Sequence, residues 1–280
     1  MKVEVHRDPR AFLGASGEFI SQDPWSSSVV ASVAERIASG VEPGSGDDIF
    51  ISVEEEGLVV GVAMHTPPHA LFLSRMPAAA ADRLAQALAR RARQLPGVSG
   101  AEDSTTAFAR AWFQLTGRRS RLVVALRLYR LHTLAAPEAA SGHPAAARAP
   151  EDTEVVSRWL REFHDEATPQ APAQDWSAVA RRRLAGGDVQ LWRDGGRPVA
   201  MACFSRTAAA VARVGPVYTP PQFRRRGYGA AVTATAAKAA LLAGAREVVL
   251  YTDLANPTSN SIYVAIGFRP DHDAQELRFT

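Results

Sequence analysis

The sequence of 280 residues contains a single cysteine, Cys203, and this scarcity excludes several kinds of protein at once. One cysteine cannot form an intrachain disulfide or a cysteine-rich metal site, and its use fits a reducing compartment. Cys203 lies in the apolar run 199–204. We therefore expect an inert core residue here rather than a nucleophile.

Long hydrophobic runs are also absent. The first eight residues are largely charged, and no stretch is apolar over the length that a signal peptide or a membrane span requires. The sequence therefore predicts a cytoplasmic protein with no membrane partner.

Neither sign of charge is in large excess, since 32 basic residues stand against 29 acidic ones for a formal net charge of +3. This balance is only a weak indication of nucleic-acid binding. Arginines cluster at 181–183 and 224–226, but the first cluster ends a predicted helix, where cations complement the helix dipole. We expect neither a nucleic-acid partner nor a bound metal.

The chain has enough apolar residues, 46% of the total, to bury the cores of two ordinary domains. Residues 134–150 are rich in Ala, Pro, Ser and Gly and show no apolar periodicity, which is typical of a linker. This stretch divides the chain into an N-terminal domain, 1–133, and a C-terminal domain, 151–280.

The C-terminal part shows alternating helix and strand signals. Helical spacing with capping residues predicts helices at 153–166, 175–184, 229–243 and 256–266. Period-two or buried apolar runs predict strands at 189–192, 198–206, 209–218, 247–252 and 275–279. The order α, α, β, β, β, α, β, α, β predicts an α/β domain with a mixed sheet.

A loop of glycines and arginines joins the third of these strands to the Ala-rich helix. Gly227 and Gly229 let the backbone turn tightly and approach a ligand, while the first turn of the helix offers unpaired N–H groups that favour phosphate. Arg224, Arg225 and Arg226 add positive charge. The loop therefore predicts a pyrophosphate-binding site. An ordinary loop with a solvated basic edge is the plain alternative.

A second segment, 256–268, begins with an asparagine and ends in a Gly-Phe pair. Asn256 or Ser259 can cap its helix, and Asn260 and Tyr263 share one face because they are three residues apart. Taken alone, Tyr263 is more typical of a packed aromatic residue than of a catalytic one.

Together the two segments resemble the signature motifs of the GNAT superfamily of N-acetyltransferases. Arg224-x-x-Gly227-x-Gly229 matches every fixed position of the first motif, R/Q-x-x-G-x-G/A, and 256–268 is similar to the second. The resemblance covers about 151–280. It implies the acyl-CoA N-acyltransferase fold, with a twisted sheet that opens a cleft between the strands at 209–218 and 247–252.

The resemblance also implies a reaction. An acetyl group would pass directly from acetyl-CoA, the co-substrate, to a primary amine of a small molecule or peptide, with Tyr263 as general acid near the coenzyme A sulfur. A backbone N–H of the splayed strand would stabilise the oxyanion of the tetrahedral intermediate. The residues expected to contact the cofactor are Val217, Tyr218, Thr219, Arg224, Arg225, Arg226, Gly227, Tyr228, Gly229, Ala230, Asn256 and Asn260.

No residue identifies the base that an attacking amine requires. His164, Asp165, Glu166, Asp175 and Asp188 are candidates, and each is also typical of a solvated helix or turn position. A non-catalytic acyl-CoA-binding or regulatory module, which would keep the loop without an acceptor site, therefore stays open. The motifs do not specify the acceptor, nor whether the protein is a monomer or a homodimer.

The N-terminal half repeats this order of elements without the phosphate loop. Strands are expected at 49–53, 58–64, 70–74 and 120–129, helices at 78–94 and 105–117, and a loop through Gly97 and Gly100. Where the phosphate loop would stand, Arg75-Met76-Pro77 offers no glycine. We predict two tandem acetyltransferase folds, of which the N-terminal one has lost its cofactor loop and helps shape the acceptor site or covers the sheet edge of its partner. An unrelated α/β domain is the alternative.

Overall fold

The computed structural model describes residues 1–91, 94–137, 140–167, 174–205 and 210–280. Its N-terminal half consists of β1 (Lys2–His6), α1 (Pro9–Gln22), α2 (Ser28–Ala38), β2 (Ile49–Glu55), β3 (Leu58–His65), β4 (Leu71–Leu73), α3 (Ala78–Arg90), β5 (Gly97–Ala101), α4 (Glu102–Thr116) and β6 (Ser120–Leu131). Its C-terminal half consists of β7 (His143–Ala146), α5 (Thr153–Ala167), α6 (Trp176–Gly186), β8 (Val189–Asp194), β9 (Arg197–Ser205), β10 (Val211–Tyr218), the short 3-10 helix η1 (Pro221–Phe223), α7 (Tyr228–Leu242), β11 (Glu247–Asp253), α8 (Pro257–Ala265) and β12 (Phe268–Phe279).

Apart from η1, the two halves have the same order of elements, β-α-α-β-β-β-α-β-α-β. All strands join one mixed sheet in the order β1-β2-β3-β4-β5-β12-β6-β11-β10-β9-β8-β7. Replacing each strand by its counterpart in the other half gives the same order read from the opposite end. The sheet therefore has a pseudo-twofold axis between β6 and β12, as expected for a tandem repeat of one fold.

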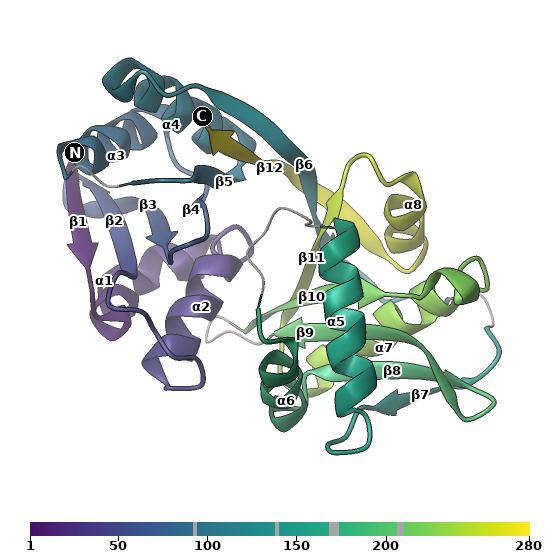
Figure 1. The fold of residues 1–280 in the computed structure, drawn as a ribbon. Helices are drawn as coiled ribbons and strands as arrows, with labels where there is room; N and C mark the ends of the chain where they lie inside the picture. The colour runs from purple at the N-terminus through teal and green to yellow at the C-terminus, as the bar shows by residue number, and fades with distance from the viewer. Residues whose placement is uncertain (92–93, 138–139, 168–173, 206–209) are drawn as a thin grey trace.

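The last strand of each repeat is exchanged with the other. β6 pairs with β11 of the C-terminal repeat, and β12 pairs with β5 of the N-terminal repeat. The two exchanged strands also pair with each other along nearly their whole length. Figure 1 shows them between the two lobes of the molecule. Neither repeat completes its sheet with its own residues alone.

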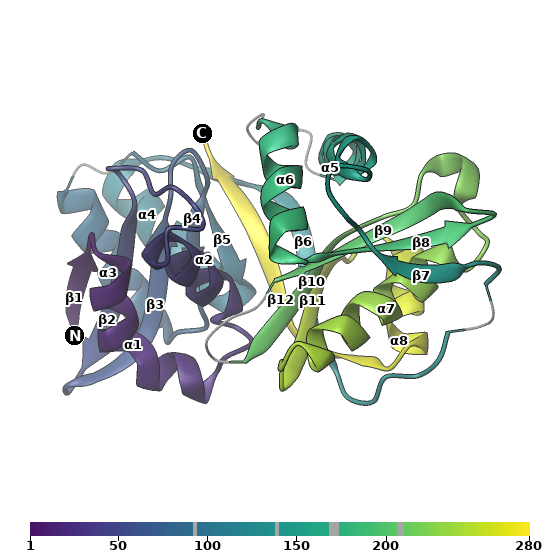
Figure 2. The ribbon, with the colours of Figure 1, turned by 90° about the horizontal axis from the view of Figure 1, so that it is seen from below.

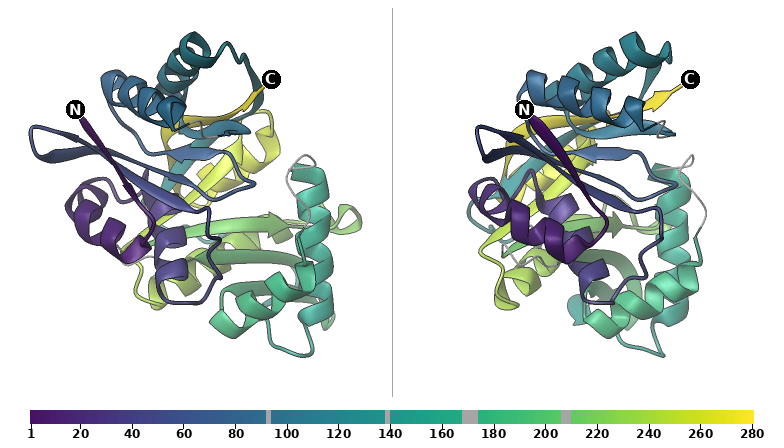
Figure 3. Two further views of the ribbon diagram at one scale, coloured as in Figure 1. Left: turned by 60° about the vertical axis from the view of Figure 1, so that its left-hand side comes forward. Right: turned by 90° about the vertical axis from the view of Figure 1, so that its left-hand side faces the viewer.

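Helices cover both faces of the sheet in each lobe. On the N-terminal part, α1 and α2 pack on one face and α3 and α4 on the other (Figure 3). On the C-terminal part, α5 and α6 cover one face and α7 and α8 the other (Figure 2). The cores are formed by alternate strand residues that point to each face.

The two lobes also meet at the segment before α2. Trp25 packs against a small cluster that includes Leu128 of β6 and Val249 of β11. The Arg130 guanidinium lies 3.6 Å from the centre of the Trp25 ring, a cation–π contact. The N-terminal helices therefore contact the face of the sheet that α5 and α6 cover elsewhere.

The structure differs from the sequence-based prediction at β5, because residues 97–101 were expected in a loop. A Cβ atom at Gly97 would lie 2.2 Å from the Leu277 carbonyl oxygen, and one at Gly100 would lie 2.0 Å from that of Leu73. The backbones of the neighbouring strands approach too closely for a side chain. Glycine is therefore required by the sheet at these positions and does not interrupt it.

Two further strands differ from expectation. The stretch 134–150, expected as a linker, includes β7, which pairs with β8 at the edge of the sheet. It has no apolar alternation because its side chains are mostly exposed and it contains Pro144, as edge strands often do. β12 begins at Phe268 instead of 275, because the residues after the buried Phe268 are mostly polar and show no apolar alternation although they pair with β6. Residues 206 and 209, placed in strands by the sequence, lie outside the described residues, as do 92 and 93 of the expected helix.

Cys203 is fully buried in β9, and burial raises the pKa of its thiol. The expected core role of this residue is confirmed. Among the helices of the described chain, none has the length and apolar character needed to cross a bilayer.

Candidate active site

β10 and β11 separate after a short parallel ladder. Only residues 211–213 of β10 pair with β11 in the described chain. Beyond them a β-bulge at Gly215 and Pro216 interrupts the pairing with β9, and Pro216 has no N–H to contribute to a ladder. The expected splay is confirmed. It leaves the β11 side of Val217 and Tyr218 without a neighbouring strand.

The loop that follows leads directly into the N-terminus of α7. Arg225 and Gly227 adopt left-handed backbone conformations, with φ of 61° and 80°, and Gly227 is the N-cap of the helix. The backbone N–H groups from Arg225 to Ala230 have no hydrogen-bond acceptor among the residues that the structure describes. Unpaired donors at the positive end of a helix form a nest of the kind that binds phosphate.

The three arginines of the loop lie differently. Arg224 is held by two acceptors, donating from Nε to the Thr219 carbonyl at 2.9 Å and from Nη2 to the Glu166 carboxylate at 2.6 Å. Arg225 and Arg226 are exposed, and within the described chain their guanidinium groups form no hydrogen bond or ion pair. Two of the three cations are therefore available to an anionic ligand beside the nest.

Tyr228 and Gly229 differ in what they can offer a ligand. The Tyr228 side chain is buried and its hydroxyl donates a hydrogen bond to Asp194, the last residue of β8. A Cβ at Gly229 would meet only Thr219 Oγ1 at 3.6 Å, so the backbone here is open to close approach. Ala230 is half-buried against the α7 core. The stretch 228–230 therefore offers a ligand mainly its backbone.

Two residues that the sequence did not indicate, Ser141 and Asp194, form hydrogen bonds beside the loop. Ser141, just before β7, donates to Asp194 at 2.7 Å and lies 3.1 Å from the Tyr228 hydroxyl. Two hydrogen bonds hold the pKa of Asp194 below its ordinary value: the bond from Tyr228 has the larger effect and the bond from Ser141 the smaller. No local motif marks these residues, because the contact joins three separate segments of the chain.

The two asparagines of the second motif fix the start of α8. Asn256 caps the helix by accepting from the Ser259 N–H at 3.0 Å. Asn260 donates to the carbonyl groups of Asp253 and Asn256, at 3.0 and 2.8 Å, and accepts from the Tyr129 hydroxyl at 3.0 Å. Tyr129 belongs to the exchanged strand β6, so the N-terminal half supports this part of the site directly.

Tyr263 is nearly buried on α8, with 9% of its surface exposed, and packs edge-on against Phe268. Burial raises the pKa of its phenol to about 12, although a hydrogen bond with Ser259 acts in the opposite direction. The hydroxyl is therefore protonated throughout the neutral range, as a proton donor to a leaving thiolate must be.

The candidate bases lie in different places. Glu166 reaches the end of β10, where it accepts a hydrogen bond from the Tyr218 hydroxyl at 3.0 Å. Asp175 instead caps α6, and the His164 ring packs against Trp176. Asp188 directly precedes β8, whereas Tyr218 is level with Leu191 farther along that strand, so Asp188 is not at the end of β10 where Glu166 lies.

The N-terminal repeat has a pocket of about 410 Å³ at the counterpart of the C-terminal splay, between the ends of β4 and β5. Its loop has no comparable nest, because the Met76 N–H donates to Ser104 Oγ at 3.0 Å and Pro77 has no N–H. Glu102 and Asp103 add negative charge to the lining of this pocket. The pocket is therefore unsuited to a pyrophosphate.

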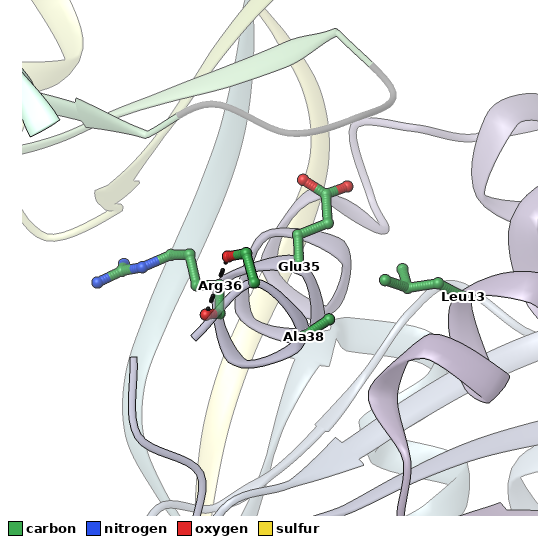
Figure 4. A pocket seen from close by; sticks show the side chains of 5 residues that line it. Leu13, Glu35, Arg36 and Ala38 are labelled. Atoms are coloured by element: carbon green, nitrogen blue, oxygen red, sulfur yellow. Dashed lines mark hydrogen bonds between the residues drawn. The ribbon is translucent and has the colours of Figure 1, made fainter. Parts of the chain in front are cut away.

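Another hollow lies on the α1–α2 hairpin. Figure 4 shows Leu13, Glu35, Arg36 and Ala38 around it. Arg36 points away from Leu13 and pairs with Glu42 at 3.4 Å. The polar side chains that line the hollow do not converge on one point, so the hollow lacks the features of a substrate site. In the described part of the chain, no three His, Cys, Asp or Glu side chains gather as a metal site.

A sheet that splays beside a nest of N–H groups at a helix N-terminus defines the acyl-CoA N-acyltransferase fold. Residues 153–268 match the model of the acetyltransferase (GNAT) family. This segment therefore forms a GNAT-type domain, and the domain is an acyltransferase by class. No curated protein matches the chain.

Solved structures share this fold over most or all of the chain. A GNAT-family acetyltransferase from Colwellia psychrerythraea aligns with a TM-score of 0.58 and 12% identity, over 100% of this chain and 99% of that one. A GCN5-related N-acetyltransferase from Kribbella flavida aligns with a TM-score of 0.55 and 22% identity, over 78% and 86%. A tandem GNAT protein from the clavulanic acid biosynthesis pathway aligns with a TM-score of 0.58 and 15% identity, over 100% and 98%. At these identities the similarity concerns the fold.

Proposed function

We propose that the protein transfers an acetyl group from acetyl-CoA to a primary amine of a small molecule or peptide. The observation that carries this proposal is the row of unpaired N–H donors from Arg225 to Ala230, beside the exposed guanidinium groups of Arg225 and Arg226. A pyrophosphate matches both the donors and the charge, and acetyl-CoA carries one.

Each part of the splay has a role in this proposal. On the side that faces β11, the backbone of Val217, Tyr218 and Thr219 has no partner strand and is available to the amide groups of the pantetheine arm. Acetyl-CoA supplies the acyl group as an activated thioester. Tyr263 donates a proton to the leaving sulfur, and Asn256 and Asn260 hold α8 so that Tyr263 is correctly placed.

The N-terminal repeat, within residues 1–133, binds no cofactor in this proposal. The Met76 N–H of its loop is bound to Ser104 and Pro77 has no N–H; the role of this repeat is to complete the sheet of the catalytic repeat, within 151–280, through β6. The segment 134–150 joins the repeats and contributes β7 to the sheet and Ser141 to the hydrogen bonds beside the loop.

The experiment that tests the function combines two measurements on the full chain. Calorimetric titration with acetyl-CoA is expected to show saturable binding, and a panel of small amines and lysine-containing peptides is expected to give acceptor-dependent release of free thiol. Binding without thiol release from any acceptor would favour a non-catalytic acyl-CoA-binding module. No binding at all would contradict the proposal.

The variant Tyr263→Phe is expected to lower kcat by roughly 100-fold, since this is the usual contribution of a positioned proton donor. The Kd for acetyl-CoA is expected to stay the same, because the ring and its packing remain. The pKa of about 12 places ionisation of Tyr263 far above neutrality, so the wild-type kcat should not fall from its ionisation as the pH rises from about 7 to about 10.

A matched control is Tyr251→Phe, which removes another hydroxyl whose pKa burial raises to about 12. Tyr251 packs with Trp25 on the other face of the sheet, so this variant is expected to keep kcat near the wild-type value. Equal losses of kcat in the two variants would argue against a specific role of Tyr263.

A further inference from the structure

Two hydrogen bonds to the Glu166 carboxylate connect the last turn of α5 to the cofactor loop, and a third lies within the loop. Glu166 accepts from the Tyr218 hydroxyl at Oε1, 3.0 Å, and from Arg224 Nη2 at Oε2, 2.6 Å. The same guanidinium donates from Nε to the Thr219 carbonyl at 2.9 Å. The connection therefore spans the turn from 219 to 224 that immediately precedes the nest.

An exposed ion pair alone would contribute little, and the side chains of Glu166 and Arg224 are 46% and 44% exposed. This pair differs because one of its partners is fixed in the core. Tyr218 is only 4% exposed, and its ring centre lies 6.4 Å from that of Trp159 on α5. A carboxylate that bridges a buried hydroxyl and a guanidinium has a defined position, so it can fix the guanidinium in turn.

Burial and the hydrogen bond to Glu166 together raise the pKa of Tyr218. The phenol therefore remains a donor to Glu166 at neutral pH. Both oxygens of the Glu166 carboxylate are engaged in the structure, Oε1 by the Tyr218 hydroxyl and Oε2 by the Arg224 guanidinium.

We propose that Glu166 is a positioning residue for the cofactor loop: it holds Arg224, and through Arg224 the turn 219–224, so that the N–H groups after it face one ligand. This role rests on the proposed function for its ligand, acetyl-CoA. Glu166 lies on α5, outside both motif segments. The loop signature includes Arg224 but does not specify which residue Arg224 pairs with.

The test uses Glu166→Ala and the more conservative Glu166→Gln in the full chain. Glu154→Gln serves as the control, since Glu154 is an exposed carboxylate on the first turn of the same helix. Acetyl-CoA affinity is measured by calorimetry. Loop order is measured without ligand by the rate of tryptic cleavage after Arg225 and Arg226.

Glu166→Ala is expected to raise the Kd for acetyl-CoA about tenfold, the loss of one charge-assisted hydrogen bond, and to speed tryptic cleavage in the loop. Its kcat at saturating acetyl-CoA should stay near the wild-type value. Glu166→Gln keeps an acceptor for Tyr218 and is expected to fall between Glu166→Ala and the wild type. In a double-mutant cycle with Arg224→Ala, the second substitution should add little.

Two results would overturn the proposal. Unchanged affinity together with unchanged cleavage in Glu166→Ala would show that the loop does not depend on Glu166. A fall in kcat at unchanged Kd would place Glu166 at the acceptor instead. If the wild type does not bind acetyl-CoA, the proposed function fails, while the cleavage rates still decide whether Glu166 orders the loop.

Discussion

The double variant Arg226→Glu, Gly229→Glu is expected to abolish measurable binding of acetyl-CoA. Both substitutions place a carboxylate at the start of α7, where unpaired N–H groups and the helix dipole favour an anion. Removal of one charge-assisted hydrogen bond costs about 1.5–3 kcal/mol, so the Kd should rise by at least about 100-fold when two sites are changed. Calorimetric titration of the variant beside the wild type measures this directly.

The variant should fold, because a Cβ at Gly229 has ordinary clearance from Thr219 and Arg226 is exposed. A control with the same change in net charge is Arg121→Glu with Gly46→Glu. Arg121 is exposed on β6, and a Cβ at Gly46 has no atom within 4 Å. If the loop variant and this control bind acetyl-CoA equally well, the cofactor site lies elsewhere in the molecule.

The loop was predictable from sequence because its chemistry is local. Left-handed φ at Gly227, open space at Gly229 and the first turn of α7 all lie within a few residues of one another. The helix that follows and the strand before it have clear periodicity. Whether this loop binds acetyl-CoA stays a prediction.

The order of elements was largely predictable in the C-terminal half, and in the N-terminal half only from residue 49 onward, since β1, α1 and α2 were not predicted; the arrangement of strands was not predictable in either half. β6 and β12 look like ordinary strands in the sequence, and nothing local indicates that each pairs across the repeat boundary. The strand at Gly97–Ala101 was missed for a related reason, since its glycines are explained only by the backbones of β4 and β12 on either side.

The role of Glu166 could not be separated from that of its neighbours on sequence alone. Five titratable side chains were equivalent candidates for the base, because helix spacing does not say which turn of α5 lies over the end of β10. The contact with Tyr218 depends on how α5 packs on the sheet through Trp159. Tertiary packing therefore decides which of these side chains reaches the end of β10.

Strand exchange makes a second large effect predictable: the C-terminal repeat alone, residues 138–280, is expected not to fold. Without β6, the β11 edge from Val249 to Asp253 has no partner, and β12 is left without either of its neighbours. Asn260 is also deprived of the Tyr129 hydroxyl. A domain with a typical stability of about 5–15 kcal/mol has little reserve against the loss of two strand pairings and a hydrogen bond. Far-ultraviolet circular dichroism and urea unfolding of the fragment measure the effect.

The matching control is the same fragment co-expressed with residues 1–137, so that only the chain connection is cut. The two pieces are expected to assemble, because β6 can still lie between β11 and β12, and the complex should bind acetyl-CoA and unfold in one transition. A fragment 138–280 that unfolds cooperatively on its own and binds acetyl-CoA as tightly as the intact chain would contradict this account. The N-terminal repeat would then be dispensable for the fold of its partner, and the exchanged strands would be a detail of packing and not the element that makes two repeats one protein.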